Sequence, residues 1–195
     1  MSLLGIDVGT TGCKAAVFSR EGQQIASAYE EYDNLRPKPG WAELDAAEVW
    51  GKVKGTVRQV ASDAASDPIE ALAVSSLGEA MVPVTADRQV LGPSILNFDA
   101  RGEEYLESLG TQLPDNLLYQ IHGNTLGNHY GLTKLIWIRD HQPELYERAD
   151  KFLLWGSFVP FMLGAEPVVD YALANRTLLF DLDQETWSDD ILQLV

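Results

Sequence analysis

The residues with the most suggestive chemistry lie near the start of the chain, between Gly5 and Lys14. A short apolar run leads to one carboxylate, and glycines, threonine hydroxyls and a lysine ammonium follow. Glycines let the backbone approach an anion closely, and successive N–H groups in such a turn form an anion-binding nest. A carboxylate suits this place if it holds Mg²⁺, a hard cation that takes carboxylates and waters. The segment therefore predicts a phosphate and magnesium site, although an ordinary glycine-rich hairpin turn explains the same residues. The candidate residues are Asp7, Gly9, Thr10, Thr11 and Lys14.

Three further candidates lie where expected strands or helices begin or end. Glu79 follows a strand, a position that often carries ligand contacts in α/β folds, but a surface glutamate in a turn is the alternative. Asp99 stands two residues before Arg101, so a local ion pair or a helix cap is as good an interpretation as function. Tyr130 precedes an expected helix, where a tyrosine usually packs in the core or at its rim.

The histidines and the single cysteine do not form a recognisable reactive group. His122, His129 and His141 lack the spacing of metal ligands, so we interpret them as structural or surface residues. Cys13 has no base near it in the sequence, which favours a small packed side chain over a nucleophile.

Composition and charge narrow the classes of protein to consider. The 195 residues include 14 Lys+Arg and 29 Asp+Glu, for a formal net charge of −15. Such an acidic chain repels phosphate backbones and anionic membranes, so we expect no nucleic-acid or membrane partner. The longest apolar stretch, near residues 152–165, is too short and too broken to span a bilayer. One cysteine and an N-terminus without a secretory signal predict a cytoplasmic protein.

The apolar patterns predict strands first and helices later. We expect strands over residues 3–7, 14–19, 24–32, 69–75, 79–84, 89–96 and 151–154, the first three as an antiparallel meander. The strongest helix pattern follows Asp45, which forms a capping box with Glu48. Beyond residue 100 we expect helices over 133–139, 143–149 and 188–195. The last of these is cut off by the chain end, so we expect the chain to be part of a larger architecture.

Several segments, in order along the whole chain, resemble the FGGY carbohydrate kinases, which include xylulose, glycerol and gluconate kinases. These segments are residues 5–14, 40–50, 97–101, 130–137 and 170–177. The Asp-x-Gly-Thr turn is shared with actin-like ATPases, whereas Gly-Trp-x-Glu-x-Asp is the more specific marker. The resemblance implies an α/β fold of the ribonuclease-H-like, actin-like ATPase type, with a mixed sheet and flanking helices.

The resemblance also implies a division of roles. Residues 1–195 would be the N-terminal domain of an FGGY-type sugar kinase, and ATP, Mg²⁺ and a sugar or polyol would meet in the cleft beside a C-terminal domain absent from this chain. The phosphate and metal side would comprise Asp7, Gly9, Thr10, Thr11 and Lys14, with Asp7 at the metal, and the sugar side would comprise Glu79, Asp99 and Tyr130. The family's catalytic base lies in a Gly-Gly-x-Asp segment of the second domain, so no catalytic residue is assigned in this chain.

Departures from the family pattern leave the sugar open. Gly78 stands where glycerol kinases place an arginine that grips the polyol, Leu77-Gly78 replaces the Met-His of xylulose kinases, and Asn97 stands where a tryptophan is common. The main hypothesis is a carbohydrate kinase whose isolated 195-residue chain is inactive. A non-catalytic actin-like nucleotide-binding module and a binding-only remnant are the alternatives, and a homodimer is left open.

Overall fold

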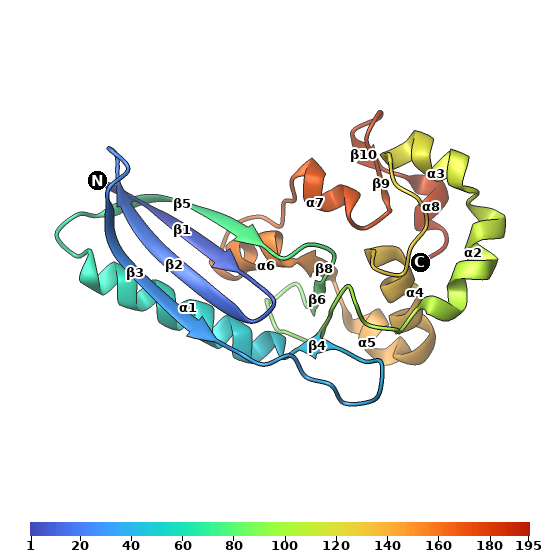
Figure 1. Cartoon of the computed structure of the whole chain (residues 1–195), viewed down its shortest axis with the longest axis horizontal. Helices are drawn as coiled ribbons and strands as arrows, with labels where there is room; N and C mark the ends of the chain where they lie inside the picture. Colours follow the sequence, from blue (N-terminus) through green and yellow to red (C-terminus); the bar gives the residue numbers. More distant parts are fainter.

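The first part of the chain folds into a four-stranded mixed sheet (Figure 1). The computed structural model describes all of residues 1–195. Strands β1 (Ser2–Val8), β2 (Gly12–Ser19) and β3 (Gln24–Glu31) form the predicted antiparallel meander. Strand β5 (Ile69–Ser76) lies parallel to β1, and the sheet order is β3-β2-β1-β5. This order places the carboxyl ends of β1 and β5 side by side.

Helix α1 (Ala46–Asp63) packs on one face of this sheet and confirms the strongest helix prediction. The Asp45 carboxylate accepts the backbone N–H groups of Ala47 and Glu48, each at 3.0 Å, and so caps the helix. The apolar face of α1 and the alternate apolar positions of the strands share a core of 26 buried residues. The opposite face of the sheet carries the exposed Asp7 and Lys14.

Short strand pairs connect the sheet to the rest of the chain. Strand β6 (Met81–Val84) pairs antiparallel with β8 (Lys151–Leu154), which helix α6 (Trp155–Met162) follows. Strand β4 (Glu43–Leu44) pairs with β7 (Ser94–Ile95). The strand expected over residues 89–96 is therefore wrong for most of its length. Gly92 and Pro93 interrupt it, because proline has no N–H to donate to a ladder.

The remaining chain forms a helical lobe with a second core of 12 buried residues. Its elements are the 3₁₀ turn Glu103–Tyr105, α2 (Leu106–Gln112), α3 (Asp115–His122), α4 (Gly131–His141), α5 (Pro143–Arg148), α7 (Tyr171–Asn175), β9 (Phe180–Asp181), β10 (Thr186–Trp187) and α8 (Asp189–Leu192). The β9–β10 pair is absent from the strands that the sequence predicts, and α8 is shorter than the helix predicted over residues 188–195.

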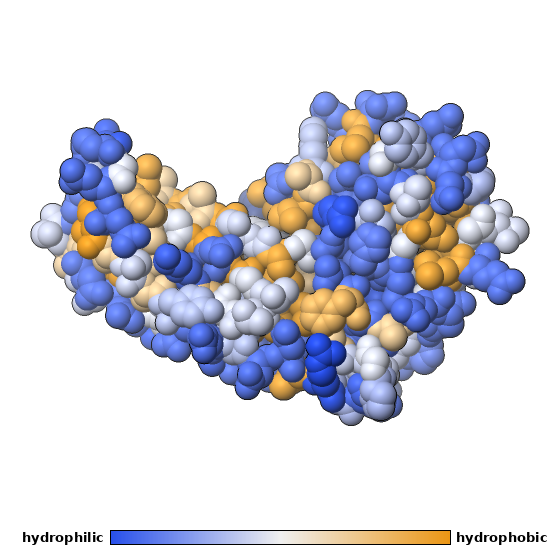
Figure 2. Space-filling view, in the orientation of Figure 1, coloured by the Kyte–Doolittle hydropathy of each residue, from blue (hydrophilic) through white to orange (hydrophobic).

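The sheet and the helical lobe stand on either side of a hollow in the surface (Figure 2). In Figure 1, α7 lies on the helical side of this hollow and the sheet lies on the other. No helix of the structure has the length and apolarity needed to cross a membrane. The two parts of the chain are also linked by Arg176, which follows α7 and pairs with Glu79 after β5.

Candidate functional site

The glycine-rich turn joins β1 to β2, and hydrogen bonds from Tyr32 hold its backbone in place. The Gly9 N–H donates to the Gly12 carbonyl oxygen at 2.9 Å, which leaves Thr10 and Thr11 at the tip of the hairpin. The Tyr32 hydroxyl lies 2.7 Å from the Gly9 carbonyl oxygen and 3.0 Å from that of Gly12. Burial raises the pKa of Tyr32 far above its usual value, so the hydroxyl keeps its proton and acts as a donor. Its role was not recognised from the sequence.

The glycine at position 12, which closes the turn, lies against a side chain of the neighbouring strand. A Cβ atom there would come within 2.6 Å of the Cζ atom of Tyr29 on the neighbouring strand. A real side chain could not stay that close without displacing the ring. The small residue therefore lets the Tyr29 ring lie directly against the start of β2.

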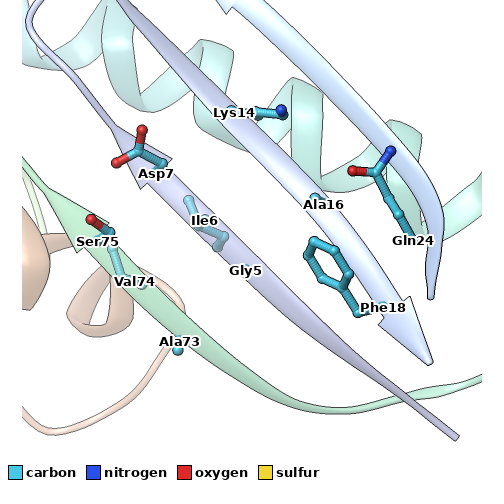
Figure 3. A pocket seen from close by; sticks show the side chains of 10 residues that line it. All are labelled: Gly5, Ile6, Asp7, Lys14, Ala16, Phe18, Gln24, Ala73, Val74 and Ser75. Carbon is cyan, nitrogen blue, oxygen red and sulfur yellow. The ribbon is translucent and has the colours of Figure 1, made fainter. Parts of the chain in front are cut away.

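Asp7 and Lys14 lie opposite each other on neighbouring strands, on the sheet face that α1 leaves open. With Ser75 of β5 they line one end of a shallow depression of about 400 Å³, and Phe18 lines its other end (Figure 3). Both charged side chains are exposed, and neither forms a salt bridge within the chain. The carboxylate and the ammonium are therefore available to a ligand.

The donor set at this turn suits a phosphate with its magnesium ion. Mg²⁺ is usually held by one or two carboxylates together with waters and substrate phosphates, rather than by a cage of protein ligands. The structure has no group of three or more His, Cys, Asp or Glu side chains that could form such a cage. The residues present fit this pattern: Asp7 offers a single carboxylate, and Lys14, Thr10 and Thr11 offer an ammonium and two hydroxyls.

Glu79 lies at the same end of the sheet as this turn because the ends of β1 and β5 are tied together. The Leu77 N–H donates to the Val8 carbonyl oxygen at 2.8 Å, which brings the segment after β5 to the end of β1. Glu79 itself has a φ of 57°, a left-handed conformation that is strained for a residue with a side chain. Its carboxylate is paired with Arg176, whose Nε donates to Oε1 at 2.6 Å.

Arg176 connects Glu79 to Tyr130. The guanidinium carbon lies 4.6 Å from the centre of the Tyr130 ring, in cation–π contact. The Tyr130 hydroxyl is 3.1 Å from Asn124 Oδ1, and Asn124 Nδ2 donates to Asn175 Oδ1 at 3.2 Å. The structure thus brings two of the three predicted sugar-side residues together. Arg176 lay in a segment that resembled the family, but no role was assigned to it from the sequence.

Asp99 belongs to a separate, buried cluster. It is 1% exposed, and its carboxylate accepts the Arg101 backbone N–H, the Arg101 guanidinium and the Ala42 N–H. Burial opposes ionisation of Asp99, but these hydrogen bonds and the Arg101 charge outweigh it and lower the pKa of Asp99 below its usual value. Arg101 also pairs with Glu43 at 2.8 Å and lies 4.0 Å from the centre of the Trp41 ring system. Both Asp99 carboxylate oxygens are therefore occupied by protein donors.

Helix α4 links the two clusters. Tyr130 is its N-terminal flanking residue, and Lys134 lies one turn further along. The buried Lys134 Nζ donates to the carbonyl oxygens of Asp99 at 2.8 Å and Arg101 at 2.6 Å. Burial lowers the pKa of Lys134 to about 8. The position of the Asp99 cluster is thus coupled to that of Tyr130.

Comparison with known proteins places the whole chain in one family. Residues 2–195 match the N-terminal domain of the FGGY family of carbohydrate kinases. A glycerol kinase from Halorhodospira halophila is 31% identical over 200 residues, which cover 98% of this chain and 39% of that enzyme. The chain thus spans about two-fifths of the length of the curated relatives it matches.

Solved structures show the same fold. The xylulose kinase from Rhodospirillum rubrum matches with a TM-score of 0.92 at 24% identity, over 100% of this chain and 40% of that one. The glycerol kinase from Plasmodium falciparum, solved with ADP, matches with a TM-score of 0.92 at 19% identity, over 99% of this chain and 40% of that one. The predicted α/β fold of the actin-like ATPase type is therefore confirmed. The chain belongs to the FGGY family of carbohydrate kinases, and it matches the family's N-terminal domain.

Proposed function

We propose that this chain is the N-terminal domain of a kinase that transfers a phosphoryl group from ATP to a hydroxyl of a sugar or polyol. One observation carries the proposal. The Leu77–Val8 hydrogen bond places the glycine-rich turn and Glu79 at the same end of the sheet. A phosphate site and a hydroxyl-binding carboxylate are then neighbours, which is the juxtaposition that phosphoryl transfer requires.

On the phosphate side, the free groups of the turn support ATP and Mg²⁺ as cofactors. We assign Asp7 to the metal, directly or through water, and Gly9, Thr10, Thr11 and Lys14 to the phosphates. When bound, the metal would neutralise the charge that develops on the transferred group. Tyr32 contributes by fixing the carbonyl oxygens of Gly9 and Gly12, so that the turn keeps one shape.

On the sugar side, we assign Glu79 and Tyr130 to the substrate wall. Glu79 retains a carboxylate oxygen without a protein partner, and Tyr130 holds Arg176 and Asn124. Asp99 acts on this side by holding the segments around Ala42 and Arg101 in place, since its own oxygens are already bonded. Lys134 then ties that cluster to the helix that Tyr130 precedes.

The proposal includes a second domain that supplies the catalytic base. The relatives are longer than this chain by a factor of about two and a half, which leaves room for such a domain. We assign no base within residues 1–195. The cytoplasmic location expected from the single cysteine stays a prediction, as does a homodimer.

A coupled assay for ADP release tests the function. The full-length kinase is incubated with ATP, Mg²⁺ and a panel of pentoses, pentuloses, glycerol and aldonic acids. We expect sugar- or polyol-dependent ADP release that Asp7→Asn lowers sharply and that Asp63→Asn, at an exposed carboxylate on α1, leaves unchanged. ADP release that no member of the panel stimulates would favour the nucleotide-binding module over the kinase.

A further inference from the structure

The ion pair between Arg176 and Glu79 leaves one group of each partner free. An arginine and a carboxylate usually form two parallel hydrogen bonds, one to each oxygen. Here both Arg176 Nε and Arg176 Nη2 contact the same oxygen, Glu79 Oε1. Glu79 Oε2 and Arg176 Nη1 have no protein partner, and Oε2 is not among the buried polar atoms left without one, so it remains accessible.

The surroundings hold this half-used pair in place. Glu79 is fixed by its left-handed backbone and has only 10% of its side chain exposed. The Arg176 guanidinium rests on the Tyr130 ring, with 35% of the side chain exposed. The missing side chain at Gly78 leaves room, since a Cβ there would contact only Arg176 Cγ, at 3.9 Å. Backbone strain retained at a polar site points to a functional use of that site.

The charges of the pair indicate which ligand fits. Glu79 would repel a carboxylate or a phosphate, and Arg176 would repel a cation. A neutral ligand that can both accept and donate hydrogen bonds avoids both repulsions. Two hydroxyls on adjacent carbons satisfy both free groups at once, because one accepts from Arg176 Nη1 and the other donates to Glu79 Oε2.

We infer that Arg176 and Glu79 form a clamp for a vicinal diol, and that Arg176 is a specificity-determining residue of the sugar side. The inference rests on the proposed function, which it deepens. It gives helix α7, which ends at Asn175 next to Arg176, a place in substrate selection.

Deoxy analogues test the clamp in the full-length kinase. The best substrate from the sugar panel is compared with each of its monodeoxy analogues, in the wild type and in Arg176→Gln, Arg176→Lys and Glu79→Gln. We expect Arg176→Gln to raise the KM for the parent sugar roughly 10- to 100-fold, the range for a lost hydrogen bond to a charged group, with the ATP KM unchanged. The analogue lacking the hydroxyl that faces Arg176 should show no further loss in this variant. Glu79→Gln should show the same pattern for the neighbouring hydroxyl.

Two controls separate binding from folding. Arg148→Gln removes an exposed arginine of α5 and should behave as the wild type. Circular dichroism melting identifies a variant that has lost its fold. If Arg176→Gln is such a variant, Arg176→Lys takes its place, because it keeps the positive charge over Tyr130 but lacks the planar guanidinium. A uniform KM increase for the parent and every analogue would overturn the clamp, as would sensitivity at two hydroxyls that are not adjacent.

Calorimetric titration of the substrates without ATP distinguishes failure of the clamp from failure of the proposed function. A wild-type protein that phosphorylates nothing but binds a polyol through Arg176 would refute the kinase and support the clamp. An active kinase whose Arg176 variants keep their KM would do the reverse. A wild type that neither binds nor phosphorylates any member of the panel would count against both.

Discussion

Replacing Asp99 by alanine removes the anion that holds the Arg101 guanidinium in the interior. Arg101 is 4% exposed, and two of its hydrogen bonds from the guanidinium go to Asp99. Only Glu43 would then face the buried positive charge. The Ala42 and Arg101 backbone N–H groups would also lose their acceptor. The substitution therefore acts on the stability of the chain before it acts on any substrate.

The expected loss is large for a single residue. Breaking a buried ion pair by removing one partner costs about 3–5 kcal/mol, because an uncompensated charge is left behind. A domain of this size has a total stability of about 5–15 kcal/mol. Each kcal/mol lowers the Tm by roughly 2–4 °C at this chain length, so the Tm should fall by roughly 6–20 °C. Asp99→Asn keeps an acceptor oxygen and should lose less.

Urea denaturation followed by circular dichroism measures this loss. Asp63→Ala, an exposed position on α1, is the matched control and should change the free energy of unfolding by less than about 0.5 kcal/mol.

The lowered pKa of Asp99 also makes the stability depend on pH. At a pH above 3.8, the ordinary pKa of an aspartate, the ionised carboxylate contributes its full stabilisation, and this contribution is lost as the pH falls through the lowered pKa. The acid-induced loss should be smaller in Asp99→Asn. A fully stable Asp99→Ala variant with a raised sugar KM would show that the carboxylate binds substrate directly, and would refute the reasoning.

Further substitutions test the phosphate side and the fold. In the proposed full-length kinase, Asp7→Asn should lower kcat much more than it raises the sugar KM, and an unchanged kcat at saturating Mg²⁺ would contradict a metal role. Tyr32→Phe should raise the ATP KM about 3- to 10-fold and leave the sugar KM unchanged, as steady-state kinetics with each substrate varied would show. Asp45→Ala should lower the free energy of unfolding by about 1 kcal/mol in urea, with Asp63→Ala again as the control. The 195-residue chain alone should give a cooperative melt but no sugar-dependent ADP release, since half a cleft cannot align two substrates. Robust ADP formation by that chain would place the base within it or in a second copy.

The sheet and α1 could be predicted because their signals are local. Short apolar runs between glycine-containing turns indicate β1, β2 and β3, and the cap at Asp45 lies within three residues of the N–H groups it bonds. The short elements could not be predicted as well. Strands β9 and β10 have two residues each, too few for a period to show, and β9 is positioned by its contacts with α3 and α7, which are distant in sequence or irregular in pattern.

The residues of the candidate site likewise differ in whether their signal is local in the sequence. The glycine-rich turn is one continuous segment, so its residue types could be identified as a group. The ion pair of Asp99 with Arg101, one of the two structural alternatives weighed for Asp99, is present and also involves residues two apart. Arg176 lies 97 residues from Glu79, and Tyr32 lies 23 from Gly9. No spacing along the chain can reveal such pairs, because only the fold brings them together.

The buried network around Arg101 has a consequence for the kinetics of folding. Its contacts span long stretches of chain: 58 residues separate Arg101 from Glu43, 57 separate Asp99 from Ala42, and 35 separate Lys134 from Asp99. Each contact can form only after the chain between its two residues has closed into a loop, which costs conformational entropy. Burying one of these charges is also unfavourable until its partner is in place. These contacts should therefore form after the folding barrier has been crossed. Interactions absent from the transition state govern the unfolding rate rather than the folding rate. The buried cluster that supports the proposed sugar site would thus determine how long the folded chain survives before it opens, and have little influence on how fast it forms.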